Sequence, residues 1–153
     1  MTRNHAILAA MLGSAALLLG AFAFQHLGGL APCKLCLWQR WPHGLAVAIG
    51  LGALALPGRA LPLLGALAAL TSAGIGTYHA GVEQGWWLGP ATCAAAPPGG
   101  LSTDALFEQI MTAPLVRCDE VAWQMLGLSM AGWNVVISLA LAGLWVLAAS
   151  TRR

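Results

Sequence analysis

Four long stretches of the chain are almost entirely apolar, and most polar residues gather between them. The stretches cover about residues 6–24, 38–56, 61–81 and 130–149. A helix needs about 20 residues to cross the hydrocarbon core of a bilayer. The second stretch reaches that length only if it starts near residue 38. The pattern predicts an all-α membrane protein, a four-transmembrane-helix bundle that forms one membrane domain over residues 1–153.

The polar segments between the stretches differ in length and charge. A tight turn covers residues 57–60, and two outer loops cover residues 25–40 and 82–129. The long loop carries every acidic residue of the chain. Within it, residues 101–111 read as a short amphipathic helix, which either lies along the membrane surface or packs on the bundle.

The arginines suggest an orientation in the membrane. Four basic residues lie at the termini and the tight turn, against three in the outer loops (Arg3, Arg59, Arg152 and Arg153 against Lys34, Arg40 and Arg117). By the positive-inside rule both termini face the cytoplasm and both outer loops lie outside. Ala21-Phe22-Ala23 could be a signal-peptide cleavage site, but the long apolar run before it favours a retained helix.

Composition agrees with a membrane protein and excludes one class of partner. Hydrophobic residues make up 59% of the 153-residue chain and charged residues 8%, with a mean hydropathy of +0.76. A soluble domain carries about 25% charged residues, so the lipid bilayer must cover much of this surface. The net charge is +2 and the basic residues are scattered, which excludes a nucleic-acid partner.

The sharpest chemical motif is Cys33-Lys34-Leu35-Cys36, followed by Arg40. A C-x-x-C pair can close an exchangeable disulfide, and a nearby cation or helix N-terminus acidifies its thiols. Because a proline inside a helix removes a backbone hydrogen bond, Pro42 suggests a helix start near Gln39. Cys36 would then face the positive end of the helix dipole. Half of a zinc site and a structural disulfide are the alternatives.

Two further features lie on the same outer side. Cys93 and Cys118 share the long loop, where a disulfide between them would either staple the loop or take part in exchange. Tyr78 and His79 end the third stretch, where either could donate a hydrogen bond to a carbonyl of a bound ring. The other histidines (His5, His26 and His43) have no comparable context.

Taken together, these residues resemble the disulfide bond formation protein B (DsbB) family of bacterial inner-membrane quinone reductases. The resemblance covers nearly the whole chain and includes Cys33 to Arg40, Tyr78-His79, Gly89 to Cys93 and Cys118-Asp119. It implies that the chain reoxidises a periplasmic thioredoxin-fold protein of the DsbA type and passes the electrons to the membrane quinone pool. The cofactor would be ubiquinone or menaquinone.

The resemblance also implies roles for the site residues. Cys93 would be attacked by the partner's thiolate, Cys118 would be its loop partner, and Cys33 would exchange with that pair. Cys36 would make the adduct or charge-transfer contact with the quinone, and Arg40 would stabilise the negative charge.

His79 is a further candidate for quinone binding. Two rival functions are a quinone and thiol enzyme of the vitamin K epoxide reductase type and a non-enzymatic membrane assembly factor with structural disulfides.

Overall fold

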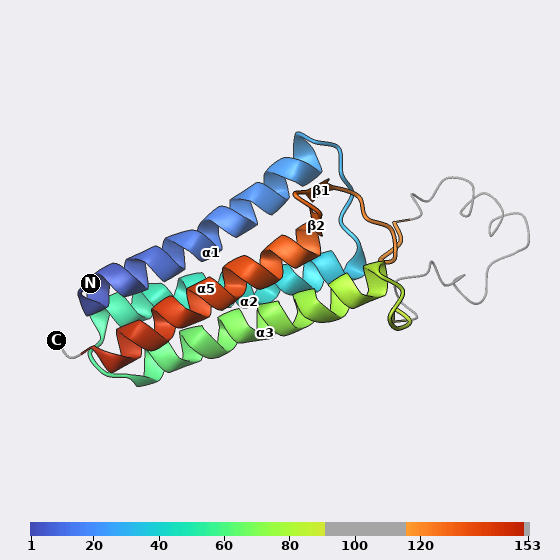
Figure 1. The fold of residues 1–153 in the computed structure, drawn as a ribbon. Coiled ribbons are helices and arrows are strands. Elements are labelled where there is room, and N and C mark those ends of the chain that lie inside the picture. The colour runs from blue at the N-terminus through green and yellow to red at the C-terminus, as the bar shows by residue number, and fades with distance from the viewer. Residues whose placement is uncertain (91–115, 152–153) are drawn as a thin grey trace, which may run out of the picture.

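The computed structural model describes residues 1–90 and 116–151 as four long helices and one small hairpin (Figure 1). The helices are α1 (Arg3–His26), α2 (Lys34–Ala55), α3 (Ala60–Glu83) and α5 (Met130–Ser150). Strands β1 (Gln124–Met125) and β2 (Leu128–Ser129) pair antiparallel. The expected amphipathic helix at residues 101–111 lies outside the described residues.

Three of these helices are long and apolar enough to cross a membrane, namely α1, α3 and α5. Their bounds agree with the apolar stretches of the sequence to within a few residues. Helix α2 has 22 residues, a sufficient length, but it is not among the three.

Helix α2 begins several residues earlier than the sequence predicted. Cys33 is its N-cap, and the helix continues through Pro42 without ending. The prediction of a start near Gln39 was therefore wrong, because it treated one lost backbone hydrogen bond as enough to stop the helix. The connection between α1 and α2 is correspondingly short and covers only residues 27–33.

The bundle is held by small residues that let the helices approach closely. Trp145 of α5 is fully buried, and its ring packs directly on Gly65 of α3. A Cβ atom added at Gly65 would lie only 2.5 Å from the nearest atom of that ring. Alanines of all four helices fill most of the remaining core. Without a hydrophobic driving force in lipid, such close packing is a main source of helix association.

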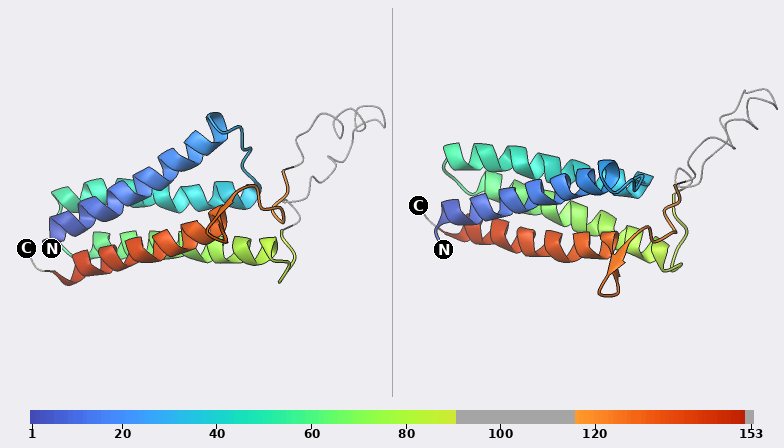
Figure 2. Two further views of the ribbon diagram at one scale, coloured as in Figure 1. Left: turned by 45° about the horizontal axis from the view of Figure 1, so that its top comes forward. Right: turned by 90° about the horizontal axis from the view of Figure 1, so that it is seen from above.

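The start of α1 and the end of α5 lie at one end of the bundle, and the start of α2 lies at the other (Figures 1 and 2). Arg3 closes the terminal end, because its guanidinium donates to the carbonyls of Leu56 (3.2 Å) and Gly58 (3.1 Å) in the α2–α3 turn. At the opposite end α1 leans away from α2 and α5 (Figure 2, left). This divergence leaves room for a cavity.

The hairpin precedes α5 at the cavity end. Its turn places Leu126 (φ 53°) and Gly127 (φ 79°) in the left-handed region, as a two-residue hairpin turn requires. The indole N–H of Trp133 donates to the Met125 carbonyl (3.0 Å) and holds the hairpin against α5. Trp123, just before β1, packs on Phe24 of α1 with ring centroids 5.2 Å apart.

Candidate functional site

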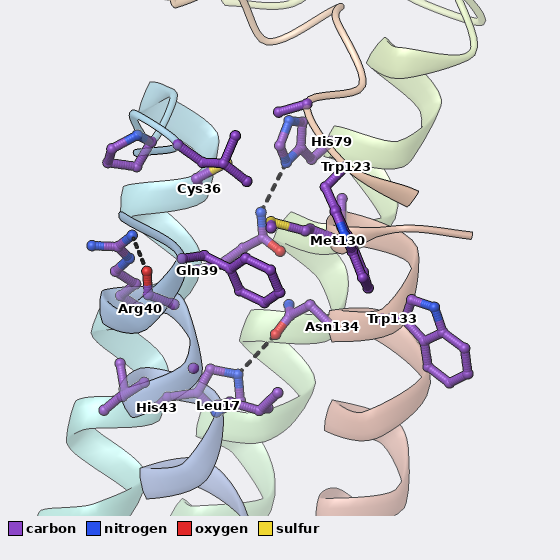
Figure 3. A pocket seen from close by; sticks show the side chains of 18 of the residues that line it. Leu17, Cys36, Gln39, Arg40, His43, His79, Trp123, Met130, Trp133 and Asn134 are labelled. Atoms are coloured by element: carbon purple, nitrogen blue, oxygen red, sulfur yellow. Dashed lines mark hydrogen bonds between the residues drawn. The ribbon is translucent and has the colours of Figure 1, made fainter. Parts of the chain in front are cut away.

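A cavity of about 470 Å³ lies between α1, α2 and α5 and reaches α3 (Figure 3). This volume is within the usual range for small-molecule sites. Its wall is mainly apolar, with Leu17, Phe24 and Ile137 among the lining residues. A few polar side chains face it, namely Cys36, Gln39, Arg40, His43, His79 and Asn134.

The C-x-x-C pair lies at the first turn of α2. Cys33 is buried, Cys36 is partly exposed, and their sulfurs are 2.9 Å apart as free thiols that share a hydrogen bond. The backbone N–H of Cys36 donates to the Cys33 sulfur (3.2 Å), which makes Cys33 the capping side chain of the helix. The positive end of the helix dipole therefore faces Cys33. The sequence had assigned that place to Cys36.

This arrangement separates the two thiols electrostatically. The hydrogen bond from Cys36, with help from His79, lowers the pKa of Cys33 to about 4 against an ordinary 9.0. Cys36 is the donor in that hydrogen bond. One thiolate shared within the pair is thus favoured at neutral pH, and the thiolate is the reactive form of a cysteine.

His79 of α3 connects the pair to a second buried polar group. Its Nε2 lies 3.5 Å from the Cys33 sulfur and 3.8 Å from the Glu83 carboxylate, and its Nδ1 lies 3.0 Å from the Gln39 amide nitrogen. Ser129 donates a hydrogen bond to the other oxygen of Glu83. His79 and Glu83 are both nearly inaccessible to solvent, with side chains 4% and 5% exposed.

Arg40 approaches the cavity one helical turn below Cys36. Its guanidinium donates to the side-chain oxygen of Gln25 (2.7 Å) and to the Ala21 carbonyl (3.4 Å), and lies over the Phe22 ring at 4.9 Å. These contacts with α1 fix a permanent positive charge on the cavity wall.

The structure brings one loop cysteine to the C-x-x-C pair. Cys118 is 1% exposed, disulfide-bonded, and packed in one buried cluster with Cys33, Leu35 and Val82. Its backbone lies near the His79 ring. Cys93 lies outside the described residues.

The inner end of the cavity carries a polar cluster that the sequence interpretation missed. His43 of α2 donates from Nε2 to the Asn134 side-chain oxygen of α5 (2.9 Å), and Asn134 donates to Ser72 of α3 (3.1 Å). The hydroxyl of Ser138 lies 3.4 Å from the same His43 nitrogen. These groups join three helices in the middle of the bundle.

A sequence signal for part of this site existed. Cys36, Gln39, Arg40 and His43 are spaced i, i+3, i+4 and i+7, which places them on one face of a helix. Starting the helix near Gln39 split this face, so Gln39 and His43 went unnoticed. Ser72 and Asn134, from α3 and α5, had no such signal, because only the packing of the helices brings them together.

Tyr78 does not share the role suggested for His79. Neighbouring residues on a helix point about 100° apart, and Tyr78 faces outward, 38% exposed. Its hydroxyl donates to the Leu88 carbonyl (2.9 Å), and its ring stacks on Trp87. Only His79 of the pair lines the cavity.

The donor atoms of Cys33, Cys36 and His79 lie within 4.8 Å of one another and could together ligate a metal ion. A structural zinc site has four protein ligands. Among the described residues this cluster offers three, one fewer than such a site needs. The cluster fits exchange chemistry better than a structural metal.

Comparison with known proteins assigns the chain to a family. The family model for disulfide bond formation protein DsbB matches residues 3–148. The chain belongs to the DsbB family. Disulfide bond formation protein B of Pasteurella multocida is 39% identical over 135 residues, covering 83% of this chain and 75% of that protein. The same-named protein of Azoarcus sp. is 30% identical, covering 95% and 92%. No solved structure matches significantly.

DsbB family membership confirms the resemblance inferred from the sequence and makes the chain a membrane protein of disulfide bond formation. The described geometry adds what membership alone does not give, namely the partners of each thiol and of Arg40.

Proposed function

We propose that the chain is a protein-dithiol:quinone oxidoreductase of the bacterial inner membrane. It reoxidises a periplasmic DsbA-type thioredoxin-fold protein and passes the electrons through its two cysteine pairs to a membrane quinone. One observation carries the proposal: the C-x-x-C pair joins two different environments. Cys36 lines the apolar cavity, while Cys33 packs in the buried cluster that holds Cys118.

The cavity suits the head group of a quinone. Its wall is apolar enough for a ring and the start of an isoprenoid tail, and a few polar groups face it from α2 and α3. Arg40 and His79 would hold the head group beside Cys36. Ubiquinone and menaquinone both fit this description. When bound, the quinone supplies the final acceptor for two electrons and two protons.

The cysteine pairs account for the electrons step by step. The partner's two thiols become a disulfide while the Cys93–Cys118 disulfide is reduced. Exchange with the C-x-x-C disulfide then oxidises the loop pair again and leaves Cys33 and Cys36 as thiols. Closing the bond between these two sulfurs releases two electrons and two protons, which leave as quinol. The buried cluster that holds both Cys33 and Cys118 supports the exchange step.

Arg40 has a defined electrostatic task in this reaction. Arg40 would stabilise the negative charge that a bound quinone would gain on its oxygens, because a guanidinium acts strongly on charge in a water-poor site. The hydrogen bonds to Gln25 and Ala21 hold the guanidinium in place beforehand. Little reorganisation is then needed during the reaction.

We further propose four membrane spans, with α2 as the fourth, and both termini in the cytoplasm. The arginine distribution and the common end shared by the termini support this topology. Alkaline phosphatase fused after Arg153 should be inactive, and the same enzyme inserted after Gly99 should be active. The opposite pattern would place the cysteines in the reducing cytosol and contradict the proposal.

The function is tested by quinone reduction in detergent with a reduced thioredoxin-fold donor. The wild-type protein should reduce quinone in step with donor oxidation. Cys93→Ser and Cys118→Ser should each block donor oxidation, and Cys118→Ser should accumulate a mixed disulfide through Cys93 because the resolving thiol is missing. Gln84→Glu, an exposed change near the same end, is the control. Full activity in both cysteine variants would reduce the loop pair to a structural staple.

A further inference from the structure

The Gln39 side chain has only one orientation that satisfies its hydrogen bonds. Its amide nitrogen lies 3.1 Å from the carbonyl oxygen of Leu35, an atom that can only accept. The NH2 group must therefore face Leu35. The same nitrogen lies 3.0 Å from Nδ1 of His79 (Figure 3).

This orientation decides where the imidazole of His79 carries its proton. A neutral imidazole has one N–H and one bare nitrogen. Because an NH2 group faces Nδ1, Nδ1 must be the bare nitrogen that accepts. The proton then resides on Nε2, the nitrogen that faces the Cys33 sulfur (3.5 Å) and the Glu83 carboxylate (3.8 Å).

We infer that Gln39 is a positioning residue that locks His79 in the Nε2–H tautomer, so that His79 serves Cys33 as a hydrogen-bond donor rather than as a base. A base would need a bare Nε2 to take the thiol proton. Here Nε2 already carries a hydrogen, and a second proton at Nδ1 would point at the amide hydrogens of Gln39.

The buried surroundings make the lock effective. Gln39 is 7% and His79 3% exposed, so water cannot replace the amide as a partner for Nδ1. The other groups that face the ring are Cys33, Glu83 and the backbone of Cys118. The Nε2–H therefore has one acceptor within hydrogen-bond distance, the Cys33 sulfur, and the Glu83 carboxylate lies farther away at 3.8 Å.

The tautomer can be read directly by nitrogen NMR of the histidine-labelled, reduced full-length protein in detergent micelles. The His79 signals are assigned by their loss in His79→Gln. At pH 7 the wild type should show a protonated Nε2 and an unprotonated Nδ1. Gln39→Glu replaces the donor by an acceptor of nearly the same shape and should leave Nδ1 protonated.

Two further variants keep the test decisive. Gln39→Met has a similar length and no donor, so it should give a mixture of tautomers even if a buried carboxylate disturbs folding. Gln84→Glu adds the same charge at an exposed position nearby and should leave both signals unchanged. A protonated Nδ1 in the wild type, or wild-type signals in both Gln39 variants, would overturn the inference.

The role of the His79 tautomer in disulfide exchange rests on the proposed function. The NMR assignment of the tautomer does not. If the tautomer shifts as expected while the wild type fails to reduce quinone, the proposed function falls and the tautomer assignment stands. If both hold, Gln39→Met should slow turnover with donor and raise the pH at which the Cys33 thiolate forms. A merely structural role would not move that pH.

Discussion

The cavity has an outer end at His79 and an inner end at His43. The two ends are built alike, but they differ in which polar groups are left available to a ligand. Each end holds a buried histidine by an amide, His79 by Gln39 and His43 by Asn134. At the outer end the remaining N–H faces a sulfur, and Arg40 adds a fixed charge. At the inner end the polar groups mostly satisfy one another across three helices.

The difference shows that, in this bundle, the polar groups that join the helices are distinct from the groups that can react. Interhelical hydrogen bonds are a common way to join helices in lipid, and they account for the His43 cluster apart from His43 Nδ1, which is buried without a hydrogen-bond partner in the described part of the chain. The end of the cavity at Cys33, Cys36 and His79, in contrast, holds two thiols beside an apolar space, and Cys33 is the more acidic of the two. The following predictions test whether reactivity belongs to the outer end alone.

The largest effect is expected from Cys36→Ser. The hydroxyl cannot replace the sulfur as an electron carrier, so quinone reduction should fall to background. The variant should still form a mixed disulfide with the donor through Cys93, because the loop pair is unchanged. Quinone reduction and gel trapping of the adduct measure the two halves separately. Quinone reduction at the wild-type rate in this variant would show that Cys36 is not the residue that passes electrons to quinone.

Arg40→Ala should lower kcat/KM for quinone by about 10²-fold, the usual loss when one preorganised donor is removed. Arg40→Lys keeps the charge but loses the planar fork that contacts Gln25 and Ala21. A smaller loss, mainly in KM, is expected there. Arg59→Ala, at the opposite end of the bundle, is the control. Unchanged kinetics in Arg40→Ala would make this arginine only an anchor to α1.

His43→Leu should reduce stability by about 1–2 kcal/mol, the scale of interhelical hydrogen bonds in lipid, with the KM for quinone changed less than about twofold. The double variant with Asn134→Leu should regain part of the loss, because an apolar pair leaves fewer polar atoms unsatisfied. Thermal unfolding in detergent measures the first effect and steady-state kinetics the second. A large rise in KM at unchanged stability would show that the inner end binds the ring.

The smallest change is expected with pH. Since the hydrogen bond from Cys36 lowers the pKa of Cys33 to about 4, the Cys33 thiolate should be present throughout pH 6–8. Ultraviolet thiolate absorbance of reduced Cys93→Ser/Cys118→Ser protein should therefore be flat across that range. A lowered pKa favours the folded reduced state above the ordinary value of 9.0. That contribution should fade as the pH drops from 9.0 towards 4. A titration centred near pH 8 would contradict the thiolate assignment.

How much was predictable depended on whether a feature was local. The apolar stretches gave the bounds of α1, α3 and α5 closely, because length and hydropathy are properties of one segment. The motif from Cys33 to Arg40 identified one wall of the cavity for the same reason. The start of α2 was misjudged at Pro42, and this error hid Gln39 and His43. The place of Cys118 in the same buried cluster as Cys33 depends on how the chain returns to the bundle, which no local pattern encodes.

Arg3 carries a consequence for the order in which the chain is assembled. Its guanidinium is buried against Leu56 and Gly58, residues synthesised more than fifty positions later. A buried charge without partners is strongly disfavoured, so the start of α1 must stay in contact with water until the α2–α3 turn has formed. The N-terminal end of α1 should then dock only after α2 and α3 have come together at their turn.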